Sequence, residues 1–129
     1  MPSSISFDAA SGFITVAHHG TDDEASLRNI LFQVIGLIKE QGCYRVLSDY
    51  RDALVHMPPA AIYEYPKEAT EAANAAGIDP QKIRHAVLMS AQTPNLADFE
   101  FYETVSFNRG RKVKGFIDRD QAIGWLTEK

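Results

Sequence analysis

The chain has one cysteine and one tryptophan among its 129 residues, and it contains no long basic run and no long apolar run. A single thiol, Cys43, excludes an internal disulfide and any zinc site built from paired cysteines. The formal net charge of −4 gives no field that attracts polyanions, so we expect no nucleic-acid partner. The apolar stretches are far shorter than a membrane span, so no integral membrane segment is expected. The first residues, Met1 to Ser6, lack the features of a secretory signal, which predicts a cytoplasmic location.

The sequence also lacks the common catalytic motifs. It has no Gly-rich phosphate loop, no Gly-x-Ser-x-Gly elbow and no His-Glu-x-x-His. His18 and His19 are adjacent, and on a strand their side chains would point to opposite faces, so they are not expected to share a metal ion. We therefore predict no cofactor and no metal, and a non-catalytic role is favoured over an enzyme.

The N-terminal residues predict a β-hairpin. Ile5 and Phe7 alternate with polar residues, and Phe13 to Ala17 form a second β-rich run. The residues between the two runs, Ala9 to Gly12, are typical of a turn.

A long helix should follow the hairpin. Thr21 to Glu24 has the pattern of a capping box, with Thr21 as the expected cap. Apolar residues then recur at three- and four-residue spacing from Leu27 to Ile38, which predicts one wide buried face. Gly42 is expected to end this helix in a left-handed conformation.

The middle of the chain alternates short strands with helices. Tyr44 to Asp49 reads as a buried strand, followed by a polar loop from Asp49 to Asp52. Pro66 should divide the next helical region, from Met57 to Ala76, into two pieces. His85 to Met89 reads as another buried strand.

The last third repeats this alternation. Thr93 and Pro94 are expected to start an aromatic-rich helix that Arg109 and Gly110 close. A strand from Val113 to Ile117 then runs into a helix capped by Asp118. This helix has an apolar stripe that should be buried against the sheet. The stripe consists of Ala122, Ile123, Trp125 and Leu126.

The predicted order is β-β-α-β-α-β-α-β-α, with no internal repeat and no linker. Each later strand follows a helix long enough to serve as a crossover, so parallel pairing is expected. The sequence thus predicts one α/β domain over residues 1–129.

This order resembles the SpoIIAA-like family, which is related to STAS domains and to the Sec14/CRAL-TRIO lipid-transfer fold. Tyr44 to Arg51 and the segment from Arg109 to Leu126 carry the resemblance, which extends over nearly the whole chain. It implies a superhelix of β-α units, with an N-terminal hairpin and a mixed, mostly parallel sheet of about five strands flanked by four or five helices. The family usually has no catalytic role.

The chain departs from the family at one position. In the phosphorylated anti-sigma-factor antagonists, a Ser that accepts phosphate lies two residues after a strand-ending Asp. Asp49 matches that Asp, and Arg51 occupies the position of the Ser. The resemblance therefore implies that this protein is not switched by phosphorylation; the nearby hydroxyls of Ser48 and Ser90 do not follow the motif.

Three functions remain open. The first is a regulatory module that binds a protein partner through Asp49, Tyr50 and Arg51, with a homodimer as one form of that contact. Asp52 and His56 add further polar side chains near Asp49, Tyr50 and Arg51. A second alternative is therefore an uncharacterised enzyme that uses Asp49 and His56.

The other alternative is a protein that binds a small apolar, lipid-like ligand, by analogy with the Sec14/CRAL-TRIO branch. Aromatic side chains on two predicted helices would then form either a pocket lid or a dimer face. The candidates are Tyr63, Tyr65, Phe101 and Tyr102. A basic cluster of Arg109, Arg111, Lys112 and Lys114 is interpreted as a solvated helix end and strand edge.

Overall fold

The structure is a computed structural model that describes residues 3–56, 58–90, 92 and 96–128. Within these ranges the chain forms five strands, four α-helices and one short 3₁₀ turn, Pro80–Lys82, in the predicted order. The strands lie side by side in chain order, β1-β2-β3-β4-β5. β1 pairs with β2 antiparallel and every later pair is parallel. The predicted mixed, mostly parallel sheet is therefore confirmed.

The N-terminal hairpin is also confirmed, with β1 at Ser3–Asp8 and β2 at Phe13–Asp23. The Asp8 carboxylate holds the turn, because it accepts from the backbone N–H of Ala10 at 2.9 Å and from Ser11 Oγ at 2.8 Å. Gly12 closes the turn at φ 81°, a conformation that favours glycine.

β2 is longer than the sequence predicts, and this moves the start of the first helix. α1 spans Glu24–Gln41, and its cap is Asp23, whose carboxylate accepts from the backbone N–H of Ser26 at 2.9 Å. The predicted cap, Thr21, instead pairs with Leu54 inside the sheet. The prediction of Thr21 was wrong because the parallel strand β3 extends β2 beyond the point where local capping signals begin. Gly42 ends the helix at φ 63°, as predicted.

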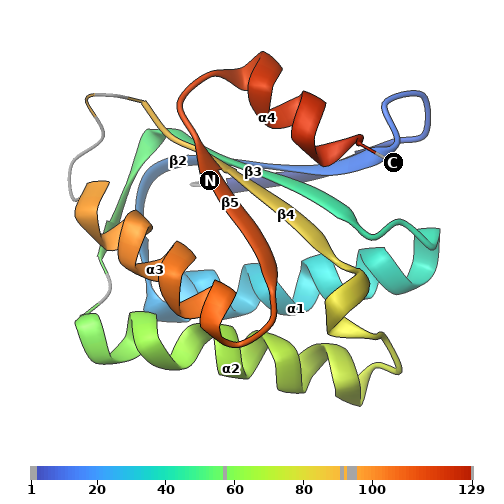
Figure 1. Cartoon of the computed structure of the whole chain (residues 1–129), viewed down its shortest axis with the longest axis horizontal. Coiled ribbons are helices and arrows are strands. Elements are labelled where there is room, and N and C mark those ends of the chain that lie inside the picture. Colours follow the sequence, from blue (N-terminus) through green and yellow to red (C-terminus); the bar gives the residue numbers. More distant parts are fainter. Residues whose placement is uncertain (1–2, 57, 91, 93–95, 129) are drawn as a thin grey trace.

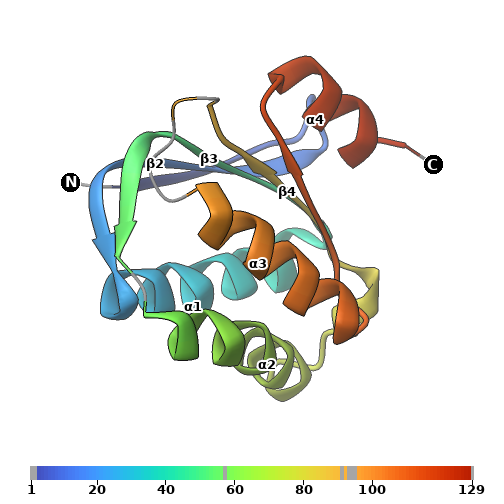
Figure 2. The same cartoon turned by 60° about the vertical axis from the view of Figure 1, so that its left-hand side comes forward.

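β3 runs from Arg45 to His56, through the segment that the sequence indicates as a loop. It pairs with β2 over almost its whole length, whereas its pairing with β4 ends at Asp49 opposite Leu88. The loop prediction was wrong because polar residues fit a two-stranded ribbon whose outer face is exposed. In Figures 1 and 2 this ribbon of β2 and β3 curves away from the rest of the sheet.

α2 is one helix, Pro59–Ala75, with Pro66 inside it, and the prediction of two pieces was wrong. A proline within a helix removes a hydrogen bond and usually breaks it. Here the Pro66 ring is almost fully buried, together with Ala69 and Ala73 on neighbouring turns. Burial of this face against the core offsets the missing bond.

The last four elements are β4 (Arg84–Leu88), α3 (Leu96–Asn108), β5 (Lys112–Phe116) and α4 (Arg119–Leu126). The predicted cap at Thr93 and Pro94 lies outside the described residues. The predicted Asp118 cap is confirmed, since its carboxylate accepts from the backbone N–H of Asp120 at 3.0 Å. Ile117, predicted as a strand residue, is exposed after β5.

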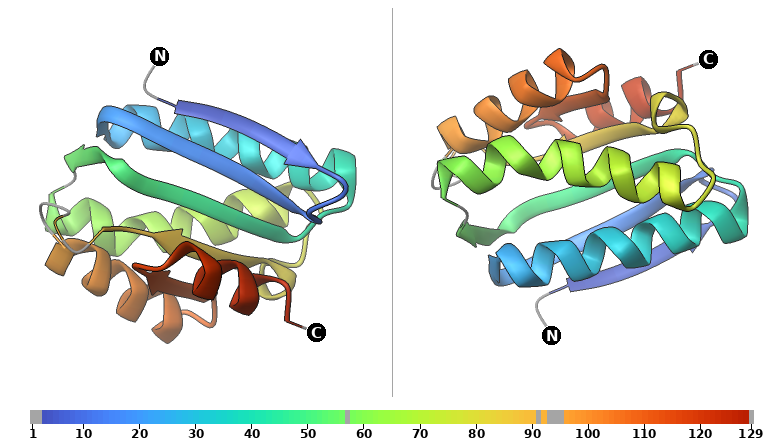
Figure 3. Two further views of the ribbon diagram at one scale, coloured as in Figure 1. Left: turned by 90° about the horizontal axis from the view of Figure 1, so that it is seen from above. Right: turned by 90° about the horizontal axis from the view of Figure 1, so that it is seen from below.

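The helices cover the two faces of the sheet unequally. α1, α2 and α3 lie on one face and α4 on the other (Figures 1 and 3). On the α4 face, Ala122 and Leu126 are fully buried against Leu47 and Leu88, whereas Trp125 is only half-buried at the edge of this cluster. The opposite face carries the larger core and a cavity.

Candidate functional site

The predicted partner-binding residues lie on a β-bulge of β3. Ala17 pairs with Asp49 and His19 pairs with Asp52, so one residue of β2 faces two of β3. Such a bulge redirects side chains and is common near functional sites. It coincides with the last β3–β4 pair, so it lies at the carboxyl end of the parallel strands, where open α/β sheets bind their ligands.

The outer side of the bulge is a rigid ion pair. Arg51 donates from Nε to Asp49 Oδ1 at 3.0 Å and from Nη2 to Asp49 Oδ2 at 2.8 Å, and its backbone N–H also donates to Oδ1. Partial burial alone would raise the pKa of Asp49, but the bonds from Arg51 outweigh it and hold this pKa below its ordinary value. The arrangement presents a fixed carboxylate and a planar cation at the surface.

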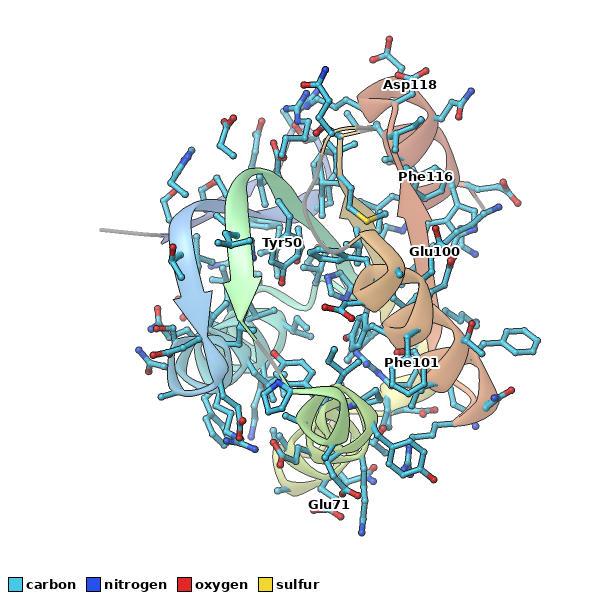
Figure 4. The ribbon with its side chains drawn as sticks, turned by 90° about the vertical axis from the view of Figure 1, so that its left-hand side faces the viewer. Tyr50, Glu71, Glu100, Phe101, Phe116 and Asp118 are labelled. Atoms are coloured by element: carbon cyan, nitrogen blue, oxygen red, sulfur yellow. The ribbon has the colours of Figure 1, made fainter. Side chains whose placement is uncertain are left out.

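Tyr50 points the other way. Its ring stacks on the buried His18 ring, with centroids 3.9 Å apart and planes 11° apart, and it meets Phe99 of α3 at 5.1 Å. Figure 4 shows Tyr50 projecting from β3 toward α3. The three predicted residues are therefore divided by the bulge, with Asp49 and Arg51 outside and Tyr50 inside.

Behind Tyr50 lies a cavity of about 110 Å³ between the sheet and helices α1, α2 and α3. Its apolar walls come mainly from α1 and from the facing residues of α2. An engineered apolar cavity of roughly this size can hold benzene. The apolar lining residues are Val16, Leu27, Ile30, Leu31, Val34, Ile35, Ile38, Val46, Ile62, Ala69, Pro80, Ile83, Val87 and Phe99.

The sheet side of the cavity also carries polar groups. Ser48 Oγ and His85 Nε2 are 2.7 Å apart across β3 and β4, and both residues line the cavity. Burial, together with the positive charge of Arg111 and the proximity of His18, lowers the pKa of His85 to about 3. The ring is therefore neutral near neutral pH, and the pair forms a buried hydrogen bond between the two strands.

The far end of the cavity carries a cation. Arg111, which precedes β5, is half-buried and donates from Nη1 to the Tyr102 hydroxyl at 3.0 Å. Tyr65 lies edge-on to Tyr102 at 6.0 Å and donates to the backbone oxygen of Leu27 at 3.1 Å. Burial raises the pKa of Tyr65, so its hydroxyl stays protonated.

The four predicted aromatic candidates are thus split between two environments. Tyr65 and Tyr102 line the cavity, whereas Tyr63 is 51% exposed and Phe101 is 41% exposed. The Arg109 guanidinium covers the Tyr63 ring at 5.0 Å from its centroid. A pocket and an exposed aromatic surface both occur, on opposite sides of α2 and α3.

The remaining polar candidates are Asp52, His56 and the adjacent histidines of β2. Asp52 is exposed, and the side chain of His56 lies outside the described residues. His18 is buried whereas His19 is exposed, as their adjacency predicts. Among the residues whose placement is described, no group of three or more His, Cys, Asp and Glu side chains could hold a metal ion. No helix in the described ranges is long and apolar enough to cross a membrane.

The fold is that of SpoIIAA. A scan of family models finds no match to the chain, and a comparison with curated proteins finds none in sequence. The structure of the Bacillus cell fate determinant SpoIIAA in the phosphorylated form is similar at a TM-score of 0.54 and 10% identity, covering 96% of this chain and 98% of that one. An anti-sigma factor antagonist from Mycobacterium paratuberculosis gives a TM-score of 0.56 at 10% identity, covering 98% and 93%.

A third similar structure is an uncharacterised protein of the DUF3478 family with a SpoIIAA-like fold, from Shewanella loihica. Its TM-score is 0.56 at 13% identity, covering 96% of this chain and 91% of that chain. The predicted SpoIIAA-like/STAS architecture is therefore confirmed, and at these identities the likeness concerns the fold.

Sequence reasoning missed the polar wall of the cavity. In the sequence, Ser48 is a hydroxyl that does not follow the phosphorylation motif, His85 begins a predicted strand, and Arg111 belongs to a basic cluster. A usable signal was present, because Ser48 and His85 are polar residues on strands that otherwise read as buried.

Proposed function

We propose that this protein is a non-catalytic regulatory module that binds another protein at the β3 bulge. The observation that carries the proposal is the SpoIIAA-like fold, which supports this role because SpoIIAA and the similar protein from Mycobacterium paratuberculosis are anti-sigma factor antagonists. The surface at Asp49 and Arg51 adds a local reason.

The bulge suits recognition because its charged groups are fixed before any partner arrives. Arg51 is held to Asp49 by two side-chain hydrogen bonds, so little side-chain freedom is lost on binding. Arginine is among the residues most often found as interface anchors. Tyr50 supports the bulge from inside through His18 and Phe99 and contributes to binding by holding it in place.

We expect no regulation of this protein by phosphorylation of the bulge. Arg51 occupies the acceptor position that the family resemblance assigns, and Ser48 is only 4% exposed. Self-association through Tyr63 and Phe101 is a further form of the same role, supported by the exposure of both rings.

The test is site-specific photocrosslinking in the native host. A photoreactive phenylalanine analogue placed at Arg51 should capture a defined partner, which is then identified by mass spectrometry. The matched control carries the analogue at Glu40, an exposed residue near the end of α1, which leads into the amino end of β3. The same products at both positions, or none at Arg51, would overturn the proposed surface.

A second candidate function is favoured by one observation. The cavity supports the binding of a small ligand, with Tyr65 and Tyr102 in its wall. An enzyme that uses Asp49 and His56 gains less support, because Asp49 is tied to Arg51 on the outer side of the sheet.

A further inference from the structure

We propose that the cavity binds a small monocarboxylate with an apolar body of about one ring, and that Arg111 and Tyr102 hold the carboxylate. This inference rests on the ligand-binding candidate and narrows it, and it is independent of the protein contact proposed for the bulge. Neither a purely apolar cavity nor a purely polar site would favour such a ligand. Here the two kinds of wall face one another across a single space.

Arg111 supplies the positive charge of the cavity. Arg111 makes no ion pair among the described residues, and one of its N–H groups is used by the Tyr102 hydroxyl. Because Tyr102 accepts that bond, its own O–H remains a donor. A guanidinium and an adjacent phenol, each with a donor left, match a carboxylate, with which charge-assisted hydrogen bonds are short and strong.

The other titratable groups in the cavity do not compete for this role. Asp98 also lines the cavity, one helical turn before Tyr102, but no ion pair joins its carboxylate to Arg111 among the described residues. The low pKa of His85 keeps its ring neutral near neutral pH, so it adds a polar wall without a second charge.

The body of the ligand would lie on the apolar wall. Leu27, Leu31 and Ile35 present one face of α1, and Ile62 and Ala69 face them from α2. The volume of about 110 Å³ suits one aromatic ring or a short acyl chain and is too small for a long fatty acid. Ligands of this kind are mostly apolar with a few placed polar contacts, as in typical small-molecule sites.

The test is an NMR titration of isotope-labelled full-length protein at neutral pH. The probes are sodium benzoate and sodium hexanoate, with benzyl alcohol as the neutral counterpart of benzoate. We expect saturable shifts for both carboxylates at millimolar concentrations or below, with contacts from benzoate protons to the methyl groups of Leu31 and Ile35. Benzyl alcohol should bind at least about 10-fold more weakly, the loss expected for a charge-assisted hydrogen bond.

Variants connect the binding to the proposed groups. Arg111→Gln should weaken benzoate by about 10- to 100-fold, whereas Lys112→Gln, which removes an equal charge from an exposed neighbour, should change it less than about two-fold. Ala69→Leu should fill the cavity and abolish binding of every probe while the fold is retained. If Arg111→Gln does not fold, Tyr102→Phe removes the second donor and should weaken benzoate about five- to ten-fold.

The possible outcomes distinguish the carboxylate site from ligand binding in general and from the protein contact at the bulge. Equal affinity for benzoate and benzyl alcohol, or no effect of Arg111→Gln in a folded protein, would overturn the carboxylate and leave the ligand-binding candidate in place. Absence of saturable binding by all three probes would overturn both. Neither result bears on the photocrosslinking test at Arg51.

Discussion

Tyr50 and His18 stack face to face across the β3 bulge, with ring centroids 3.9 Å apart and planes 11° apart. This contact joins the curved ribbon of β2 and β3 to the interior. The outer ion pair and the inner cavity are therefore two sides of one bulge. A substitution of Tyr50 should therefore lower the stability of the fold, and any loss of partner binding should follow from that.

Tyr50→Ala should lower the free energy of unfolding by roughly 2–4 kcal/mol, because it removes a half-buried ring that contacts His18 and Phe99. Tyr50→Phe keeps the ring and should recover most of the loss. Urea denaturation at constant pH measures both values. A loss below about 1 kcal/mol for the alanine variant would mean that the stacked ring does not support the bulge.

His85 should make the protein sensitive to acid. Its pKa is about 3 in the folded protein against 6.5 for an ordinary histidine, so between these values the unfolded chain binds a proton that the folded chain does not. Stability therefore rises with pH in this window, by up to about 1.4 kcal/mol per pH unit from this group.

The measurement is urea unfolding at several pH values between about 4 and 6.5. His85→Gln should show a smaller loss on acidification than the wild type, and His19→Gln, at an exposed histidine, should show the same loss as the wild type. Equal slopes for His85→Gln and the wild type would contradict the low pKa. The groups that face His85, Arg111 and His18, are unchanged in both variants.

Asp23→Ala should destabilise α1, because the Asp23 carboxylate accepts from the backbone N–H of Ser26. Thr21→Ala, inside β2, should change the free energy of unfolding by less than about 0.5 kcal/mol. Urea midpoints of the two variants decide the matter. A larger loss of stability for Thr21→Ala than for Asp23→Ala would show that α1 begins at the position expected from the sequence.

Leu126→Ala should cost roughly 2–5 kcal/mol, because this side chain is fully buried between α4 and the sheet. Trp125→Ala should cost less than Leu126→Ala, about 2 kcal/mol, since its half-buried ring meets Phe116 and the Arg84 guanidinium at the edge of the same cluster. Thermal unfolding of both variants gives the order. A larger cost for Trp125→Ala than for Leu126→Ala would show that the indole ring contributes more than Leu126 to the packing of α4 on the sheet.

Incubation with a serine kinase of the anti-sigma type should leave Ser48 unmodified, because this hydroxyl is 4% exposed and bonded to His85. Arg51 offers no acceptor. Phosphopeptide mass spectrometry measures the occupancy, with an anti-sigma factor antagonist as the positive control. Phosphate at high occupancy on Ser48 or Ser90 would restore a phosphorylation switch.

Local chemistry in the sequence was enough to predict the order of the elements. The alternation of Ile5 and Phe7, the helical period that begins at Leu27, and the caps at Gly42 and Asp118 each act within a few residues. Three local predictions failed where a neighbouring element outweighed the local signal, and the first was the helix cap at Thr21, which pairs with β3 instead. Pairing with β2 extended β3 through polar residues, and burial kept α2 continuous through Pro66.

The cavity was decided only by the tertiary structure. Ser48, His85 and Arg111 lie on separate segments, and nothing in the local sequence around each one requires them to face the same space. Parallel pairing in register brings Ser48 and His85 to the same face of the sheet, and the end of α3 delivers Arg111 to it. Periodicity reports which residues share a face of one element, whereas a site depends on how the faces of several elements meet.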